Sequence, residues 1–339
     1  MTEFKIYKLY FTSPLHISDQ HEDGSFSLRN IQSDTIYAAL SSCMAKMGYT
    51  IPSDGDLGFT VSSLFPYYQQ LVESNPIYFL PMPLQSRQPE LKDVSKAKKL
   101  KKVQWVDIAF YGKILNGTFS LTDADAFLPY IQGNYLTKEV LPLNEDGSSE
   151  FVNSEISQRV TLKSRTGQED AKPYYVDKIV FRHHAGFFFL AEGDTTLLDK
   201  ALNLLSIEGI GTDRNIGFGN FEYSTDSISI ELPQNTDHQV SLSLMIPESE
   251  EQLEILMSSD RIAYDFIRRG GWITTYPYTT IRKCAIYGFL PGSVFKKEIN
   301  QERKPVGRIV NLRPEIGELS PDHPIWRNGK SIMLPIKLT

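Results

Sequence analysis

The chain has 339 residues, a formal net charge of −6, 41% hydrophobic residues and 22% charged residues. This composition is ordinary for a globular protein and excludes wholesale disorder, and the length is enough for about two domains of roughly 150 residues each. Two cysteines, Cys43 and Cys284, are too few for a disulfide framework or a four-cysteine zinc site, so we expect a protein of the reducing cytoplasm.

The beginning of the chain is typical of a strand, a long loop and a helix. Residues 4–11 alternate between apolar and polar side chains, which predicts a strand rather than a signal peptide. A polar loop covers 16–30. Apolar residues then recur at helical spacing from Ser33 or Asp34, which are good N-cap residues, to Gly48, a natural helix terminator.

The next region, 52–175, has the character of inserted segments. It is rich in proline and aromatic residues at first and becomes polar, with glycine and serine, toward its end. A strand region at 177–190 and an amphipathic helix at 196–205 follow, and then a strand at 221–232. The longest apolar run in the chain is far shorter than the ~20 residues of a membrane span, so we expect no membrane partner.

A linker is predicted at 233–237, and after it the pattern starts again. Residues 238–246 are typical of a strand, 249–259 of a helix, and three further strand regions follow. Both halves therefore follow the order strand, helix, strands. This order predicts an α+β protein with two ferredoxin-like (RRM-like) domains built on antiparallel sheets, at 1–232, with insertions at about 52–175, and at 237–339.

The most specific motif is a glycine-rich loop between the helix at 196–205 and the strand at 221–232. Two Gly-x-Gly pairs, at Gly209, Gly211, Gly217 and Gly219, surround Arg214. Glycines allow positive φ and the close approach of another chain, and an arginine is suited to phosphate. The spacing matches neither a Rossmann fingerprint nor a P-loop. A flexible hairpin loop is the alternative interpretation.

Two other segments concentrate basic residues, although the net charge of −6 argues against a nucleic-acid partner on average. If 159–165 is extended, one face carries a basic stripe made of Arg159, Thr161, Lys163 and Arg165. Such a stripe suits a polyanion, or is simply a solvated strand face. The lysine cluster at 92–102 is most simply a solvated helix face.

In the C-terminal half, basic and aromatic residues are interleaved. Arg268, Arg269 and Trp272 precede a Tyr/Pro loop, and Arg282 and Lys283 follow it. This arrangement suits single-stranded nucleic acid, because bases stack on rings while phosphates meet the cations. The alternative is that the aromatic side chains pack in a core.

Residues for catalysis are sparse. His16 could act as an acid or a base, but His183 and His184 point to opposite faces of a strand. Cys43 lies mid-helix among apolar residues, as a core residue would. Because no metal-ligand spacing or carboxylate cluster is present, we expect no catalytic residues, no metal and no cofactor.

Four N-terminal motifs together resemble the RAMP superfamily of CRISPR proteins: PLHIS at 14–18, SDTIYAAL at 33–40, RVTLKSRTG at 159–167 and GIGTDRNIGFGNFE at 209–222. The C-terminal segments RGGW, IRKCAIYGFLPGSVF, PVGRIV and HPIWRNGKSIMLPIKL make the resemblance more specific. They are similar to the family of the fourth Csm subunit of type III-A effector complexes, in the Cas-five group. The resemblance covers nearly the whole chain.

The resemblance implies a non-catalytic subunit that binds the 5′ handle of the guide RNA (crRNA) and caps one end of the filament. It also implies docking against the large polymerase/cyclase subunit and a backbone subunit, with target RNA near the handle junction. A protruding hairpin, or thumb, that kinks the guide is expected within 130–158. The candidate RNA-binding residues are Gly209, Gly211, Arg214, Asn215, Gly217, Gly219, Arg159, Lys163, Arg165, His16, Ser33, Arg268, Arg269 and Lys283.

Two alternatives to this function stay open from the sequence. One is a metal-independent RAMP endoribonuclease that processes precursor crRNA, with His16 in acid–base chemistry beside a Tyr or Lys. The other is a scaffold that binds only proteins, in which the basic stripes are merely solvated.

Overall fold

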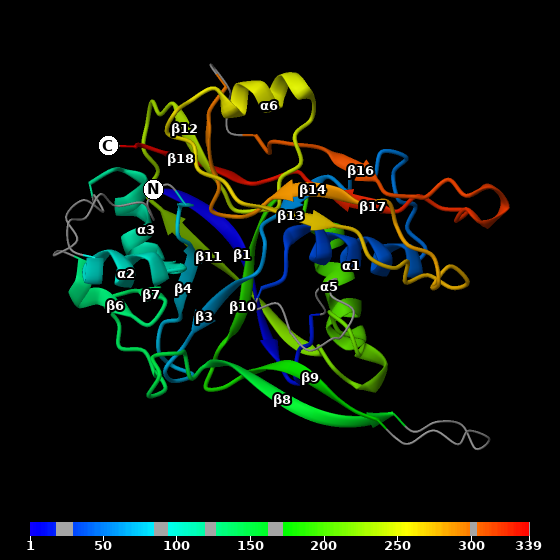
Figure 1. Cartoon of the computed structure of the whole chain (residues 1–339), viewed down its shortest axis with the longest axis horizontal. Coiled ribbons are helices and arrows are strands. Elements are labelled where there is room, and N and C mark those ends of the chain that lie inside the picture. Colours follow the sequence, from blue (N-terminus) through cyan, green and yellow to red (C-terminus); the bar gives the residue numbers. More distant parts are fainter. Residues whose placement is uncertain (18–29, 85–93, 119–126, 162–171, 299–303, 339) are drawn as a thin grey trace.

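The computed structural model describes residues 1–17, 30–84, 94–118, 127–161, 172–298 and 304–338. The protein is a mixed α+β structure in which almost every pair of neighbouring strands is antiparallel (Figure 1). Among the described residues, no helix is long and apolar enough to cross a membrane.

The centre of the molecule is the long first strand, β1 (Thr2–Phe11), which lies where the alternation of apolar and polar residues predicted it. It pairs antiparallel with β10 (Gly186–Gly193) on one side and β11 (Phe221–Ile230) on the other. Strand β10 also pairs with β2 (Phe59–Val61) and β3 (Phe65–Tyr68). The resulting order around β1 is therefore β11-β1-β10, followed by β2 and β3.

Two helices cover one face of this sheet. Helix α1 (Ser33–Lys46) and helix α5 (Thr196–Glu208) were both predicted from their apolar spacing, and they pack against each other. They bury Tyr7 and Leu9 of β1 and Phe189 of β10 in one apolar cluster, to which Cys43 also belongs. Because side chains alternate along a strand, the remaining residues of β1 face the opposite side of the sheet.

The opposite face packs on the insertion and on the C-terminal half. Ile6 and Leu190 lie in one buried cluster with Val240 and Leu334, which come from beyond the linker at 233–237. The two halves of the chain thus meet in a shared core. The insertion contributes β4 (Ile77–Pro81), α2 (Val94–Lys102), β5 (Trp105–Asp107), α3 (Ile108–Leu115), η2 (Leu128–Tyr130), β6 (Ile131–Gln132) and β7 (Tyr135–Leu136).

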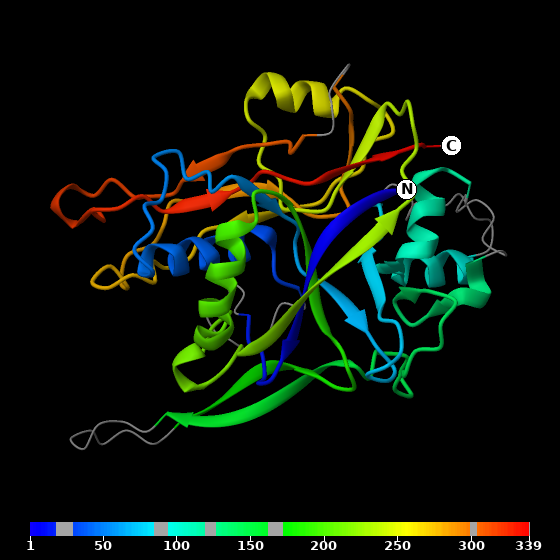
Figure 2. The same ribbon diagram turned by 180° about the vertical axis from the view of Figure 1, so that it is seen from behind.

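A two-stranded hairpin extends away from the body of the molecule, as Figures 1 and 2 show. It consists of β8 (Val152–Thr161) and β9 (Lys172–Phe181). The sequence predicted a protruding hairpin within 130–158, which is too early: 131–136 form the short strands β6 and β7. The strand region predicted at 177–190 is two strands, β9 and β10, joined through a turn at His183, whose φ of 56° is left-handed.

Beyond the linker, three strands form a small sheet in the order β15-β12-β18. The predicted helix at 249–259 is α6, which Ser249 caps by accepting a hydrogen bond from the Gln252 N–H. The elements of this half are β12 (His238–Ser241), α6 (Glu250–Met257), β13 (Phe266–Arg269), β14 (Ile286–Phe289), β15 (Val294–Lys296), β16 (Ile309–Asn311), η4 (Gly317–Leu319), β17 (Trp326–Asn328) and β18 (Met333–Ile336).

Candidate nucleic-acid interface

The base of the glycine-rich loop 209–219 is packed against the protein's own backbone. The loop joins α5 to β11, and Gly209, Gly211 and Gly219 all have positive φ. A Cβ at Gly219 would collide with the Ile210 carbonyl, and one at Gly211 with the His16 carbonyl. These three glycines are therefore required by close approach within the fold, which corrects the expectation that they admit another chain.

The tip of the same loop, 214–217, is exposed. Asp213 has a left-handed φ of 62°, and the short turn η3 (Arg214–Ile216) follows it. The tip is braced from within, since the Gly217 N–H donates to the Arg214 carbonyl at 3.0 Å. A Cβ at Gly217 would meet nothing within 4 Å, so the space around this position is open. The tip holds the side chains of Arg214 and Asn215 toward solvent on a rigid base.

The loop is joined to the β8–β9 hairpin by one ion pair. The Arg159 guanidinium of β8 donates to the Asp213 carboxylate at 2.7 Å and lies 5.0 Å from the centre of the Phe218 ring. The structure thus brings together two motifs that the sequence indicated separately. Lys163 and Arg165 lie outside the described residues.

The face of β8 that carries Arg159 is turned toward the glycine-rich loop. The sequence had indicated that this face forms a basic stripe available to a ligand. Arg159 is half-buried against the loop, whereas Ile156 is 71% exposed and Val160 is 51% exposed. Tyr175, opposite Gln158 on the same face, is 55% exposed. The outward face therefore carries exposed apolar side chains on either side of the polar Gln158, and the sequence did not predict them.

His16 is a structural residue in this fold. It is buried, and its Nδ1 lies 2.6 Å from the Asp177 carbonyl of β9. Its own carbonyl accepts a hydrogen bond from the Thr212 N–H at 2.8 Å. His16 therefore ties the loop after β1 to both the hairpin and the glycine-rich loop, and its placement corrects the expectation that it contacts RNA directly.

Ser33 and Arg269 also hold the fold together. Ser33 is buried, and its hydroxyl accepts from the Leu244 N–H of the C-terminal half at 2.9 Å. The Arg269 guanidinium donates to both carboxylate oxygens of Asp34, at 2.7 and 3.1 Å, and Arg327 donates to the same carboxylate at 2.8 Å. These contacts join the start of α1 to β13 and β17, so both Ser33 and Arg269 have a structural role in this fold.

This cluster has more positive than negative charge. Burial alone would raise the pKa of Asp34, but the charges of Arg269 and Arg327 outweigh it and hold the pKa of that carboxyl below its usual range. Lys283 lies beside the cluster, where burial and the positive charge of Arg327 lower its pKa to about 8. One carboxylate here faces two guanidinium groups and an ammonium group.

An aromatic and basic surface lies beside this cluster, on the β13–β14 pair. Arg282 stacks over the Trp272 ring at 4.7 Å, and Phe266 meets Tyr287 edge-to-face at 5.8 Å. All four side chains are exposed, as is Arg268. The Arg268, Trp272 and Arg282 side chains therefore lie at the surface and are not packed in a core.

The lysine cluster of α2 borders a groove. A hollow of about 1030 Å³ lies beside Lys99, Lys101 and Lys102, with Trp105 on its wall. Within the described parts of the chain, no group of three or more His, Cys, Asp or Glu residues is placed to hold a metal ion. The features that distinguish the molecule chemically are cationic and aromatic surfaces.

Comparison with known proteins gives these surfaces a context. The family model described as CRISPR Csm4 C-terminal domain matches residues 234–336, which begin within the predicted linker. The CRISPR system Cms protein Csm4 of Mycobacterium tuberculosis (strain CDC 1551 / Oshkosh) is 25% identical over 312 residues, covering 89% of each chain.

Two solved structures have the same fold. One is a chain in the crystal structure of the Csm3-Csm4 subcomplex of the type III-A CRISPR-Cas interference complex, with a TM-score of 0.61 at 17% identity, covering 98% of this chain and 100% of that chain. The other is a chain of the Csm1-Csm4 cassette in complex with cA4, with a TM-score of 0.58 at 18% identity, covering 100% and 99%.

In fold and in sequence the chain is similar to RAMP-type proteins of CRISPR systems. More specifically, it is similar to the Csm4 family over most of its length, and the resemblance seen in the sequence is confirmed.

Proposed function

We propose that this protein is a non-catalytic subunit of a type III-A CRISPR effector complex that binds the 5′ handle of the crRNA. The observation that carries the proposal is the exposed tip 214–217, held on a rigid base and joined to a protruding hairpin. The similarity to Csm4 proteins supports it, because these relatives are named as CRISPR system proteins.

The tip suits an RNA backbone in its chemistry. Arg214 supplies a planar, permanently charged donor for phosphate, and the Asn215 amide can both donate and accept hydrogen bonds. Arg159 adds a second cation beside the tip, although its charge is shared with Asp213. These groups read shape and charge rather than base identity.

The hairpin β8–β9 is the best candidate for the thumb that kinks the guide. Ile156, Val160 and Tyr175 form an exposed face on which an unstacked base can rest, since aromatic and apolar side chains stack on bases without sequence preference. The cationic loop lies beside the far end of the paired strands, at Arg159, and would hold the backbone there. We therefore place the handle–spacer junction along this hairpin.

We also propose that the N-terminal half has a ferredoxin-like topology. The strand order β11-β1-β10-β2, antiparallel throughout, supports this, as do α1 after β1 and α5 after β10. In the βαββαβ arrangement both helices lie on one face, as they do here. The other face is then available for the C-terminal half.

For protein partners we propose a large subunit and a backbone subunit, because two similar structures are the Csm1-Csm4 cassette and the Csm3-Csm4 subcomplex. Exposed aromatic and arginine side chains are enriched at protein interfaces, and the β13–β14 surface has both. Arg268 and Lys283 on this side are the proposed contacts for RNA near the junction.

The burial of His16 disfavours an endoribonuclease that depends on it.

The test is to purify the tagged chain from cells with its associated molecules. We expect nuclease-protected short RNAs that share one 5′ end, together with other complex subunits. RNA without a common end, or none, would refute handle binding. Repeat RNA incubated with the pure chain in a chelator should stay intact, and specific cleavage would refute the non-catalytic role. His16→Ala should leave target cleavage by the assembled complex unchanged.

A further inference from the structure

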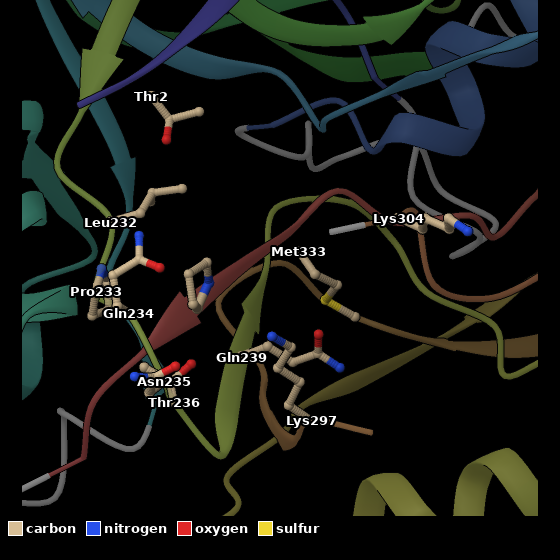
Figure 3. A pocket seen from close by; sticks show the side chains of 11 residues that line it. Thr2, Leu232, Pro233, Gln234, Asn235, Thr236, Gln239, Lys297, Lys304 and Met333 are labelled. Atoms are coloured by element: carbon tan, nitrogen blue, oxygen red, sulfur yellow. The ribbon is translucent and has the colours of Figure 1, made fainter. Parts of the chain in front are cut away.

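A partly open pocket lies between the linker and the C-terminal sheet (Figure 3). Its volume is about 340 Å³. The linker forms one wall with residues 232–236, and the β15-β12-β18 sheet forms the other with Gln239, Met333 and Pro335. The volume is at the lower end of that of small-molecule sites in proteins.

Strand register brings the polar groups of the sheet wall to one face. Gln239 lies opposite Pro335 in β18. The Lys297 N–H donates to the Asp237 carbonyl at 2.7 Å, which continues the pairing of β12 with β15 by one step. Because positions 237 and 239 share a face of β12, Lys297 and Gln239 stand diagonally next to each other, and both line the pocket.

Two polar atoms in this pocket are buried and have no hydrogen-bond partner among the described residues. Gln239 is only 4% exposed, and its Nε2 has no partner. The hydroxyl oxygen of Thr236, on the linker wall, is in the same situation. Buried polar groups are almost always hydrogen-bonded, because leaving one unpaired destabilises the folded state. A ligand that met these groups would remove that cost.

The charge of the lining favours an anion. Lys297 and Lys304 both line the pocket, and among the described residues that line it there is no Asp or Glu. The neighbouring carboxylate of Glu298 is not part of the lining and accepts instead from Gln252, at 3.2 Å. Lys297 forms no ion pair with any described residue. The remaining wall, with Leu232 and Met333, is apolar.

We propose that this pocket binds a small organic anion, in which a phosphate or carboxylate group meets Gln239 and Lys297 and a compact apolar body lies against Leu232 and Met333. Thr2 of β1 and Leu232 come from before the linker, whereas Gln239 and Met333 come from after it. The ligand therefore braces the two halves of the chain. This site is separate from the glycine-rich loop and does not depend on RNA binding.

The test is thermal unfolding and calorimetric titration of the full chain with inorganic phosphate, AMP and citrate, each against sodium chloride at equal ionic strength. We expect saturable binding of at least one, with a rise in Tm of about 2–5 °C at saturation. Binding of AMP but not citrate would identify a phosphate ester as the ligand, and the reverse a carboxylate. If none of the three binds, the proposal is wrong.

Variants separate this site from a general charge effect. Lys297→Met and Gln239→Leu should each raise the Kd at least tenfold, whereas Lys296→Met, one residue away and outside the pocket lining, should leave it within twofold. Gln239→Leu should also raise the Tm without ligand, because it removes the unpaired amide. Equal affinity in Lys297→Met and the unmodified chain would overturn the proposal. All three variants should retain handle RNA.

Discussion

Arg159 and Asp213 are 54 residues apart in sequence, yet their side chains meet at 2.7 Å and join the hairpin to the glycine-rich loop. Asp213 places a negative charge within a loop proposed to bind a polyanion, and its pairing with Arg159 offsets that charge locally. The pair therefore does two things at once. It fixes the angle between the two elements, and among the described residues of the tip it leaves Arg214 as an exposed cation.

A double-mutant cycle on this pair measures how firmly the two elements are joined. Arg159→Ala and Asp213→Ala should each lower the free energy of unfolding, and the coupling between them should be about 1 kcal/mol, because both side chains are partly buried. Urea unfolding of the four proteins provides the measurement. Strict additivity would mean that the ion pair does not fix the hairpin.

Arg214→Ala tests the tip directly. Loss of one charge-assisted phosphate contact should weaken the binding of handle-bearing RNA about tenfold. It should also reduce the salt dependence of log affinity by about 0.7, out of a slope near −3.5 for roughly five phosphates on a single strand. Fluorescence anisotropy across a salt series measures both quantities. Arg313→Ala, an exposed arginine in the C-terminal half, is the matched control and should change neither.

The sequence predicted β1, α1, α5 and α6 because each has one buried face. A buried face gives a regular spacing of apolar residues that can be seen in the sequence. It misplaced the protruding hairpin because a two-stranded ribbon outside the core has little apolar alternation to reveal it. In a core strand the apolar side chains are buried, whereas here Ile156 and Val160 are exposed to solvent.

In the candidate site, too, the sequence could not show which side chains are buried or paired. Residue type indicated Arg159, Arg214 and Arg269 as equivalent cations, but only tertiary contacts distinguish them. Arg269 is committed to Asp34, Arg159 is shared with Asp213, and Arg214 is exposed. The glycines lie in the connection between α5 and β11. The reason for Gly219, a close approach to the Ile210 carbonyl, depends on how that connection folds back on itself and could not be predicted from the spacing.

Asp34→Asn should be strongly destabilising. The change leaves the Arg269 and Arg327 guanidinium groups buried without a countercharge, and breaking a buried ion pair in this way costs about 3–5 kcal/mol. Because these contacts join α1 to the C-terminal half, limited proteolysis should release that half more readily. Asp260→Asn, at an exposed position, is the matched control. A loss below about 1 kcal/mol in urea unfolding would show that this cluster does not hold the halves together.

Lys283 should make stability depend on pH in an unusual direction. Its pKa is lowered from 10.5 to about 8 in the folded chain. Between these two values the unfolded chain binds more protons than the folded chain, so the free energy of unfolding should rise as the pH increases from about 8 toward 10.5. Below pH 8 the charged ammonium is a cost to the folded state, because it lies half-buried beside Arg327.

Lys283→Met removes the buried ammonium group and so measures how much its charge destabilises the folded chain. At pH 7 the variant should be more stable by on the order of 1–2 kcal/mol, and its stability should lack the rise above pH 8 that the unmodified chain has. Urea unfolding at several pH values between 7 and 10 gives both results. Lys101→Met, on the exposed face of α2, should leave the pH profile unchanged. The same dependence of stability on pH in Lys283→Met and in the unmodified chain would contradict this prediction. It would mean that Lys283 stays charged up to pH 10, and that the positive charges around Asp34 are better neutralised than their contacts indicate.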